Sequence, residues 1–341
     1  MKIIIIASDI HSGGGKVMLN DLLSAAMKMK SINFYVLADS RYDASFYSSE
    51  NIFITAISKF QRIFYVNRVV KNLSSKNDVI INISDLPTFR RFNGTVIQYI
   101  MNRYFIDDYP TIGLALLVRL RLLIEKIAFS IYLKKADYIF VQNLVMKDLL
   151  IKLGYADNTI EVIPFKNLEL VSVNKKVLEN SFLYVASGEV HKNHINLISA
   201  WEILAKENIY PQLFLTIDNN TVLYNQISEK IKINNLKIFI KPNLPREELL
   251  LYYQKVSALI YPSFFECFGI PLVEASNYNL PVIASELDYV RDLIDPTETF
   301  DPSSPRSISR SVKRFIGSKE NRNKVVTADT FTKKLALYAK K

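Results

Sequence analysis

The chain has 341 residues, and 49% of them are hydrophobic. This length exceeds the size that a single hydrophobic core usually supports, so it points to two domains. Its 43 Lys and Arg against 33 Asp and Glu give a net charge of +10, which favours anionic partners such as nucleotide phosphates, acidic lipids or nucleic acid. The single cysteine, Cys267, excludes an intramolecular disulfide, and the lack of a run of 18 uncharged apolar residues predicts no transmembrane helix.

Short apolar runs alternate with helical patterns along the whole chain. A first series of predicted strands comprises Lys2–Ser8, Asn33–Asp39, Ile52–Ile57, Asp78–Ser84, Thr95–Met101, Ala136–Asn143 and Glu161–Phe165. A second series comprises Phe182–Ser187, Gln212–Asp218, Lys237–Asn243, Ser257–Ser263 and Pro281–Ser285. Apolar strands that alternate with helices are typical of parallel sheets covered on both faces. We therefore predict an α/β fold with two doubly wound, Rossmann-like domains.

The predicted boundary between the two domains lies near Pro164–Lys176, where the alternating pattern lapses. The N-terminal domain would span residues 1–165 and the C-terminal domain residues 166–310. Residues 311–341 are strongly basic and helical in pattern. This last segment either crosses back to the N-terminal domain or extends into solvent.

The first predicted strand leads into a glycine-rich loop, Ser8–Lys16, and then a helical pattern over Val17–Met29. Ligands of open parallel sheets lie beyond the carboxyl ends of strands, so this loop is a candidate site. Its three glycines, Gly13–Gly15, would let the backbone approach a phosphate or a sugar. Met18 breaks the dinucleotide fingerprint and Val17 breaks the P-loop pattern, so a plain flexible turn is the alternative.

The segment Ile112–Lys135 has the pattern of one long, mostly apolar helix with several basic side chains. A core helix with one solvated charged face is the interpretation that we favour. The alternative is a basic amphipathic helix that lies on an anionic membrane.

A second strand-to-helix loop, Gly188–His194, carries two of the three histidines. Lys192 in this loop could neutralise a diphosphate. His191 is a candidate hydrogen-bond donor to a ligand, and His194 is better explained by packing at a helix start. Two histidines without further nearby ligands do not make a zinc site, and no Asp-x-Asp occurs to hold a metal beside a diphosphate.

The stretch Pro262–Ala275 joins a predicted strand to a predicted helix. Gly269 permits a tight turn, and Pro271 suits the first helical turn. Free N–H groups and the helix dipole make such a helix start an anion site. Glu266 precedes the turn and Glu274 lies about one helical turn inside, so the site suits a ligand with both phosphates and hydroxyls.

The spacing of these two glutamates closely resembles the E-x7-E signature of the retaining GT-B glycosyltransferases of family 4, also called group 1. The loop Ala186–His194 is similar to the donor-phosphate loop of one branch of that family, and Ser12–Gly15 to its N-terminal glycine loop. Asn102-Arg103-Tyr104, after the strand Thr95–Met101, is also similar to this branch. The resemblance spans the chain in order and implies two Rossmann-like domains that face a cleft.

The resemblance also implies roles. Glu266 and Lys192 would be catalytic, Glu266 by binding hydroxyls of the donor sugar and Lys192 by neutralising the departing diphosphate. Glu274 would accept hydrogen bonds from the ribose, and the nucleobase would lie near Lys241–Leu244. The remaining donor-binding residues would be Gly14, Gly15, His191, Phe268, Gly269 and Ile270. Asn102 and Arg103 would lie on the acceptor side, and no metal would be required.

The sequence departs from the family pattern at two points. Ser187-Gly188 stands where relatives commonly carry an arginine, so stabilisation of the leaving group would rest more on Lys192. Met101 ends a strand where many relatives carry a histidine, which puts a general-base or sugar-contacting histidine at that site in doubt.

We therefore predict a retaining hexosyltransferase that moves a sugar from a nucleotide diphosphate sugar to a hydroxyl, with no other cofactor. The acceptor would be a saccharide or a lipid-linked saccharide of a bacterial surface polysaccharide, O-antigen or capsule, and nucleic acid is not expected as a partner. The enzyme would be cytoplasmic, with contact to the inner face of the membrane left open. The alternatives are a nucleotide-sugar epimerase of the same fold, disfavoured by only three histidines, and a catalytically degenerate sugar-nucleotide-binding subunit.

Overall fold

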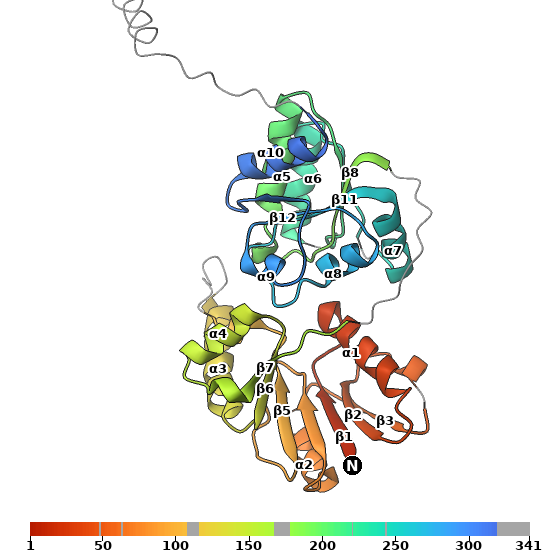
Figure 1. Cartoon of the computed structure of the whole chain (residues 1–341), viewed down its shortest axis with the longest axis vertical. Helices are drawn as coiled ribbons and strands as arrows, with labels where there is room; N and C mark the ends of the chain where they lie inside the picture. Colours follow the sequence, from red (N-terminus) through yellow and green to blue (C-terminus); the bar gives the residue numbers. More distant parts are fainter. Residues whose placement is uncertain are drawn as a thin grey trace, which may run out of the picture.

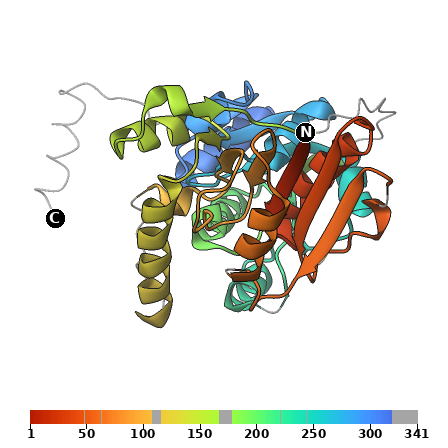
Figure 2. The same cartoon turned by 90° about the horizontal axis from the view of Figure 1, so that it is seen from below.

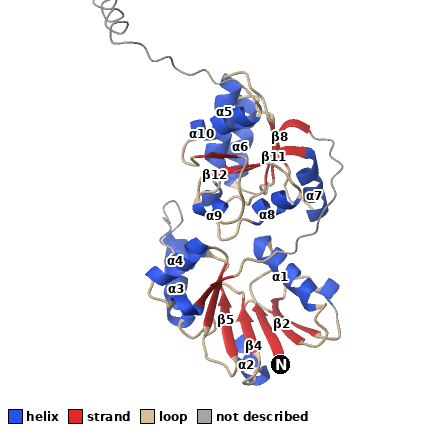
Figure 3. Cartoon of the chain, in the orientation of Figure 1, coloured by secondary structure: helices blue, strands red, loops and turns tan. Residues whose placement is uncertain are grey.

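The structure is a computed structural model, and it describes residues 1–47, 49–62, 64–107, 116–166, 178–219, 221–242 and 244–318. The chain forms two α/β domains, the N-terminal one below and the C-terminal one above in Figure 1. Helices flank the sheet of each domain, as Figure 3 shows. Two doubly wound domains are the architecture that the sequence predicts.

The N-terminal sheet has the strand order β3-β2-β1-β4-β5-β6-β7, and every neighbouring pair is parallel. Its central strand β1 pairs Ile5 with Val36 on one side and with Ile81 on the other. The solid isoleucine run of β1 is buried because helices cover both faces. The strands are β1 Lys2–Ala7, β2 Asn33–Asp39, β3 Ile52–Ile57, β4 Val79–Asn82, β5 Thr95–Tyr99, β6 Tyr138–Val141 and β7 Ile160–Val162.

The C-terminal sheet has the order β10-β9-β8-β11-β12-β13, and it is also parallel throughout. One hydrophobic cluster fills this domain on both sides of the sheet, and Trp201 and Tyr253 are among its buried side chains. The strands are β8 Leu178–Tyr184, β9 Gln212–Leu215, β10 Ile238–Ile240, β11 Val256–Tyr261, β12 Val282–Ser285 and β13 Glu298–Phe300.

The helices of the N-terminal domain are α1 Gly13–Ala26, α2 Phe64–Leu73, α3 Leu116–Leu133 and α4 Leu144–Lys152, with short 3-10 turns at η1 Ser45–Tyr47, η2 Arg103–Phe105 and η3 Asp157–Thr159. The helices of the C-terminal domain are α5 His194–Lys206, α6 Val222–Ile233, α7 Arg246–Lys255, α8 Ile270–Asn277, α9 Asp288–Arg291 and α10 Pro305–Phe315, with the 3-10 turn η4 Val190–Lys192.

All twelve predicted strands are present, with ends that differ by a few residues, and the three-residue strand β13 was not predicted. The first sheet ends at Val162 and the second begins at Leu178, so most of the predicted boundary lies in residues 167–177, outside the described residues. The predicted C-terminal segment 311–341 begins inside α10, which packs against α5. Its residues 319–341 also lie outside the described part.

Each sheet reverses its strand order at its centre, between β1 and β4 in one domain and between β8 and β11 in the other. Loops that leave the carboxyl ends of strands at such a reversal form the binding crevice of open α/β sheets. The carboxyl ends of β1 and β4 are turned toward the C-terminal domain in Figure 1. The loops after these four strands are therefore the natural place for a site.

The favoured interpretation of the long apolar helix was wrong for most of its length. In α3, Phe129 and Leu133 pack into the core of the N-terminal domain, but Leu116, Leu117, Leu120, Leu123 and Ile124 in the first turns are exposed. The structure describes the helix only from Leu116 onward, and residues 112–115 of the predicted helix lie outside the described part. A core helix would bury this apolar surface, and α3 leaves it on the outside.

Candidate functional site

The turn between β11 and α8 presents the Glu266–Glu274 stretch. Gly269 is the N-cap of α8 and has φ +70° and ψ +52°, a left-handed conformation that favours glycine. A Cβ at this position would lie 3.0 Å from Leu272 Cδ1. Pro271 occupies the first turn of α8, as the sequence predicts. Pro271 has no N–H and the Leu272 N–H donates to Gly269 O at 2.9 Å, so the Gly269 and Ile270 N–H groups are those without a backbone partner at this helix start, within the described residues.

Glu266 and Lys192 form a direct ion pair at this turn. Lys192 Nζ lies 2.8 Å from both carboxylate oxygens of Glu266, and Tyr261 donates its hydroxyl to Glu266 Oε1 at 2.9 Å. Both charged side chains are largely buried, with 16% and 9% of their surface exposed. The cation and the carboxylate therefore act from one point, where they could contact a diphosphate and a sugar hydroxyl together.

Two hydrogen bonds between loops bring Lys192 to Glu266. Asn193 adopts a left-handed conformation, which asparagine tolerates, and its side chain donates to Pro262 O at 2.9 Å. The backbone of Phe264 donates to His191 O at 2.9 Å. The loop after β8 and the loop after β11 are joined in this way, although about 70 residues separate them in the chain.

Two residues of helix α7 contact the two carboxylate oxygens of Glu274. Tyr253 donates its hydroxyl to Glu274 Oε2 at 3.0 Å, and Arg246 Nη2 lies 2.6 Å from Glu274 Oε1. Glu274 is 4% exposed, whereas Arg246 remains open to solvent on part of its surface. Arg246 and Tyr253 were not predicted, because the contact of α7 with α8 cannot be read from sequence spacing.

Residues assigned to opposite sides of the site meet at Phe265. The His191 ring stacks on Phe265 with 4.4 Å between centroids, and the Arg103 guanidinium carbon lies 5.6 Å from the same ring. Burial is the main cause that lowers the pKa of His191, which favours its neutral form. Arg103 also pairs with Asp107 at 2.7 Å, and Asn102 caps η2 by accepting from the Tyr104 N–H.

The start of α1 lies against the start of α8. The three glycines were predicted to form a loop before Val17, and the structure instead includes them in the first turn of α1. Gly13 at the start of this turn has a φ of +62°, a left-handed conformation that glycine adopts readily. A Cβ on Gly14 would lie 3.3 Å from Ile270 Cδ1, and one on Gly15 would lie 3.6 Å from Met101 Cε. Met101 thus packs where the family pattern would place a histidine.

The Glu266 loop is anchored on the N-terminal domain through its next two residues. Arg103 N lies 2.9 Å from Cys267 Sγ, and the Asn143 side chain donates to Cys267 O at 2.6 Å. Phe268 is buried in the hydrophobic cluster that contains Met18. Burial raises the pKa of Cys267 to about 12, so this thiol is not a nucleophile at neutral pH.

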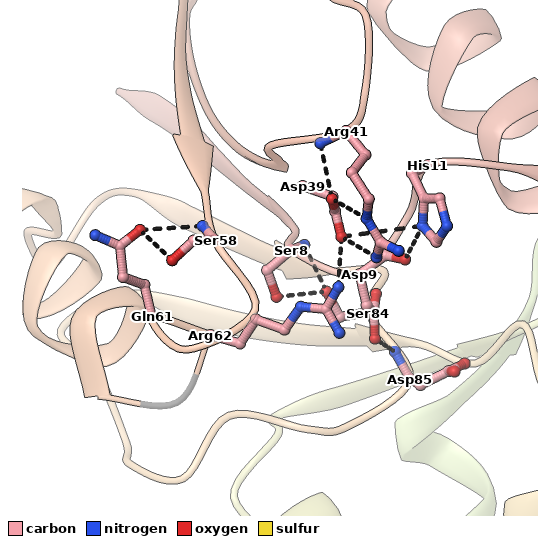
Figure 4. Close-up of polar contacts among 10 residues, drawn as sticks. All are labelled: Ser8, Asp9, His11, Asp39, Arg41, Ser58, Gln61, Arg62, Ser84 and Asp85. Atoms are coloured by element: carbon pink, nitrogen blue, oxygen red, sulfur yellow. Dashed lines mark hydrogen bonds and ion pairs between the residues drawn. The ribbon is translucent and has the colours of Figure 1, made fainter.

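The ends of the N-terminal strands carry a cluster of charged side chains, drawn in Figure 4. Asp39, at the end of β2, is 2% exposed and accepts from Arg41 Nε at 2.9 Å and from Arg62. These hydrogen bonds, first of all those from Arg41, hold the pKa of Asp39 far below its usual value. His11 Nδ1 lies 3.9 Å from the same carboxylate and 3.1 Å from Asp9 O.

Two further carboxyl groups in this cluster have raised pKa values. Asp9 Oδ2 accepts from the Asp85 N–H at 3.0 Å, while Asp9 Oδ1 is buried with no hydrogen-bond partner among the described residues. Burial raises the pKa of Asp9. Burial and then the charge of Asp9 raise the pKa of Asp85 to about 6, although its side chain remains accessible to solvent. A carboxyl group with such a pKa can exchange a proton near neutral pH.

Asp85 lies three residues beyond the end of β4 and directly follows the predicted strand Asp78–Ser84, a usable signal that the sequence interpretation missed. Ser187 donates to Glu189, at the point where the family pattern has an arginine. The predicted nucleobase region Lys241–Leu244 follows β10, and its residue 243 lies outside the described part.

His194 is a buried packing residue, and burial lowers its pKa to about 4. Within the described ranges, no group of three His, Cys, Asp or Glu could hold a metal ion.

The comparisons with known proteins concern first the C-terminal domain, which carries the Glu266–Glu274 motif. Residues 166–329 match the family model "Glycosyl transferases group 1". This agrees with the family that the sequence motif suggested, and the finer assignment to family 4 remains a prediction.

Several curated relatives are mannosyltransferases by name. The serotype-specific mannosyltransferase WbdA of Escherichia coli is 29% identical over 140 residues, which are 40% of this chain and 17% of WbdA. The O-antigen chain mannosyltransferase RfbU of Salmonella typhimurium is 25% identical over 199 residues, which are 56% of each chain. The matched region is therefore about a sixth of WbdA and about half of RfbU.

Solved structures of similar shape extend over nearly the whole chain. Sucrose-phosphate synthase from Thermosynechococcus elongatus has a TM-score of 0.69 at 17% identity, with 93% of this chain and 90% of that one covered. The lipopolysaccharide outer core galactosyltransferase WaaB has a TM-score of 0.65 at 16% identity, with the same coverage. The predicted GT-B fold is confirmed.

Proposed function

We propose that this chain is a glycosyltransferase that moves a sugar, with retention and without a metal ion, from a nucleotide diphosphate sugar to a hydroxyl. The observation that carries the proposal is the grouping of the Lys192–Glu266 pair and buried Glu274 around the start of α8. A helix start with an adjacent cation suits a diphosphate, and buried carboxylates suit ribose and sugar hydroxyls.

In the proposed reaction, the ribose hydroxyls donate to Glu274 and the sugar hydroxyls donate to Glu266. The bond between the anomeric carbon and the diphosphate oxygen breaks, and Lys192 stabilises the negative charge that develops on the diphosphate. The acceptor hydroxyl forms the new bond on the same face of the sugar, and its proton passes to the leaving phosphate oxygen. Lys192 can serve this role because it lies beside Glu266 rather than in solvent.

The sugar and the acceptor are proposed from the relatives. Since WbdA and RfbU are mannosyltransferases by name, mannose is the first sugar to test. We propose a saccharide or lipid-linked saccharide of a surface polysaccharide as the acceptor, because RfbU is named for O-antigen and another relative, CapH of Staphylococcus aureus, for capsular polysaccharide. The chain would then work in the cytoplasm at the inner face of the membrane.

The test is turnover of a panel of nucleotide diphosphate sugars by the purified chain, with and without saccharide acceptors. We expect donor hydrolysis by the wild type and its loss in Glu274→Ala and Lys192→Ala, while Lys255→Ala, an exposed lysine at the end of α7, keeps wild-type turnover. Nuclear magnetic resonance of the product would give the anomeric configuration. Full activity in both site variants would refute the site, and release of an altered sugar without an acceptor would indicate an epimerase.

A further inference from the structure

The helix α3 exposes a continuous apolar stripe. Each side chain of the stripe has between 53% and 80% of its surface exposed. The stripe consists of Leu116, Leu117, Leu120, Leu123, Ile124 and Ile127, and Ile131 extends it at 56% exposed. Soluble proteins rarely leave so large a contiguous apolar patch uncovered unless it binds something.

Helical spacing places the stripe on one side of α3. At about 100° per residue, its members fall within an arc of about 120°. Phe129 and Leu133 lie on the opposite side, where they pack with Phe105 of η2 and the core of the N-terminal domain. In Figure 2 α3, in olive, stands out along the side of the domain. The stripe therefore faces away from the protein.

Basic side chains border the stripe. Arg119 falls on one flank and Arg121 on the other, and Lys134 follows at its C-terminal end, all three exposed. Arg121 Nε forms an ion pair with Glu125 Oε1 at 2.7 Å. The chain as a whole carries a net charge of +10. An apolar strip between cations matches an anionic bilayer surface, where acyl chains meet phosphate headgroups.

The surface is suited to lying on a bilayer rather than crossing it. Among helices in the described part of the chain, none combines the length and hydropathy needed to span a membrane. Beside Ile131 the stripe continues into a hollow of about 280 Å³ with Phe105, Phe129 and Leu153 in its wall. This hollow places further apolar side chains beside the C-terminal end of the stripe.

We propose that the α3 stripe is a docking surface for an anionic lipid bilayer, with the helix axis parallel to the membrane plane. The choice of a membrane over another apolar partner rests on the proposed function, in which a lipid-linked acceptor is used. The position of α3 fits that role, because α3 packs against η2, which directly follows Asn102 on the acceptor side.

The test is co-sedimentation of the full-length purified chain with vesicles of phosphatidylcholine alone or mixed with phosphatidylglycerol. We expect binding to the mixed vesicles that weakens with salt, and about a tenfold loss of binding in Leu120→Glu/Ile124→Glu. The matched control is Val222→Glu/Ile233→Glu, two exposed apolar residues on α6 of the other domain, which should bind as the wild type does. Arg119→Gln should weaken binding to the mixed vesicles and leave binding to the pure phosphatidylcholine vesicles unchanged.

Three outcomes would overturn the proposal: no vesicle binding by the wild type, equal binding by the α3 and α6 variants, or a wild-type dimer in solution that the α3 variant dissociates without vesicle binding. Donor hydrolysis in vesicle-free buffer and the melting temperature are measured on the same samples. Unchanged hydrolysis in the α3 variant shows that the protein is folded and separates this test from that of the proposed function. Vesicle binding by a chain that hydrolyses no donor would still support the docking surface.

Discussion

On the C-terminal side of the site, charged groups are paired one to one, and both carboxylates come from the single stretch Pro262–Ala275. Lys192 pairs with Glu266, and Arg246 pairs with Glu274. On the N-terminal side, the ends of different strands supply Asp9, Asp39 and Asp85, together with Arg41 and Arg62, and several of these groups share partners. One side is a compact motif, and the other is a network assembled by the fold.

This difference separates two tasks. A nucleotide diphosphate has a fixed arrangement of phosphate and ribose, so a short motif at a helix start can recognise it. An acceptor saccharide has no such common part, and its recognition requires groups that can differ between proteins. The family model matches residues 166–329, which carry the Glu266–Glu274 motif. Under the proposed function, the N-terminal network would be the part that selects the acceptor.

Lys192→Ala and Arg103→Ala would separate the two sides most strongly. We expect Lys192→Ala to lower both donor hydrolysis and transfer by about 100-fold or more, because the leaving diphosphate loses its cation. Arg103→Ala should lower transfer by about tenfold and leave hydrolysis unchanged, since the proposal assigns Arg103, whose guanidinium lies 5.6 Å from the Phe265 ring, to the acceptor side. Steady-state kinetics with and without acceptor measure both. Equal losses of hydrolysis in the two variants would remove the distinction.

Asp39→Asn tests how far the N-terminal network holds its own domain. Asp39 is 2% exposed, and the substitution removes the negative charge that Arg41 and Arg62 share. We expect the free energy of unfolding to fall by about 3 kcal/mol. The control is Glu286→Gln, which breaks a bidentate pair with Arg291 on the surface and should cost no more than about 1 kcal/mol. Urea titration that ranks the two variants in the reverse order would contradict this assignment.

Gly269→Ala tests the turn on the donor side. The positive φ and the close approach of Leu272 should cost about 1–2 kcal/mol of stability, and the displaced helix start should weaken donor binding several-fold. Gly317→Ala is the matched control, because Gly317 has φ +69° with nothing within 4 Å of an added Cβ. The control should share the backbone cost in thermal unfolding and leave donor binding as in the wild type.

Asp85→Asn would show the smallest effect, as a dependence on pH. Because the folded-state pKa of Asp85 is raised to about 6, the folded chain binds more protons than the unfolded chain between about pH 4 and pH 6, and this group lowers stability as the pH rises through that window. Asparagine imitates the protonated form. The variant and the wild type should melt together near pH 4, and at pH 7 the variant should be more stable, by less than about 2 °C.

Asp43→Asn provides the opposite sign for that measurement. Hydrogen bonds from Ser45 lower the pKa of Asp43, so its charged form stabilises the fold above about pH 4 and that contribution is lost on acidification. The Asp43 variant should therefore melt below the wild type at pH 7. Parallel melting curves for all three proteins across the pH range would show that neither shift is present.

The sequence predicted the fold because its strands are short, strongly apolar and separated by helical patterns, and each of these signals is local. It also brought together Lys192, Glu266 and Gly269, since these residues lie in loops that leave central strands. Whether the family roles of these residues hold stays a prediction. The Glu266–Glu274 motif could be found from local sequence pattern because its residues are contiguous.

The remaining features depend on contacts between distant segments. Arg246 reaches Glu274 only through the packing of α7, and Cys267 is held by Asn143 from the other domain. The exposure of α3 was misjudged because an apolar helix has the same sequence pattern whether its surface is packed inside the fold or left exposed. Burial is decided by the whole fold and not by the segment.

The central claim is that a nucleoside diphosphate binds at the start of α8 with its ribose on Glu274. Isothermal titration calorimetry with uridine, guanosine, thymidine and adenosine diphosphates on the wild type and on Glu274→Ala tests it directly. We predict that one of these ligands binds the wild type clearly better than the others, and that Glu274→Ala weakens its affinity by about tenfold or more. Equal affinity in the two proteins, or no binding of any of the four to a folded wild type, would contradict the claim.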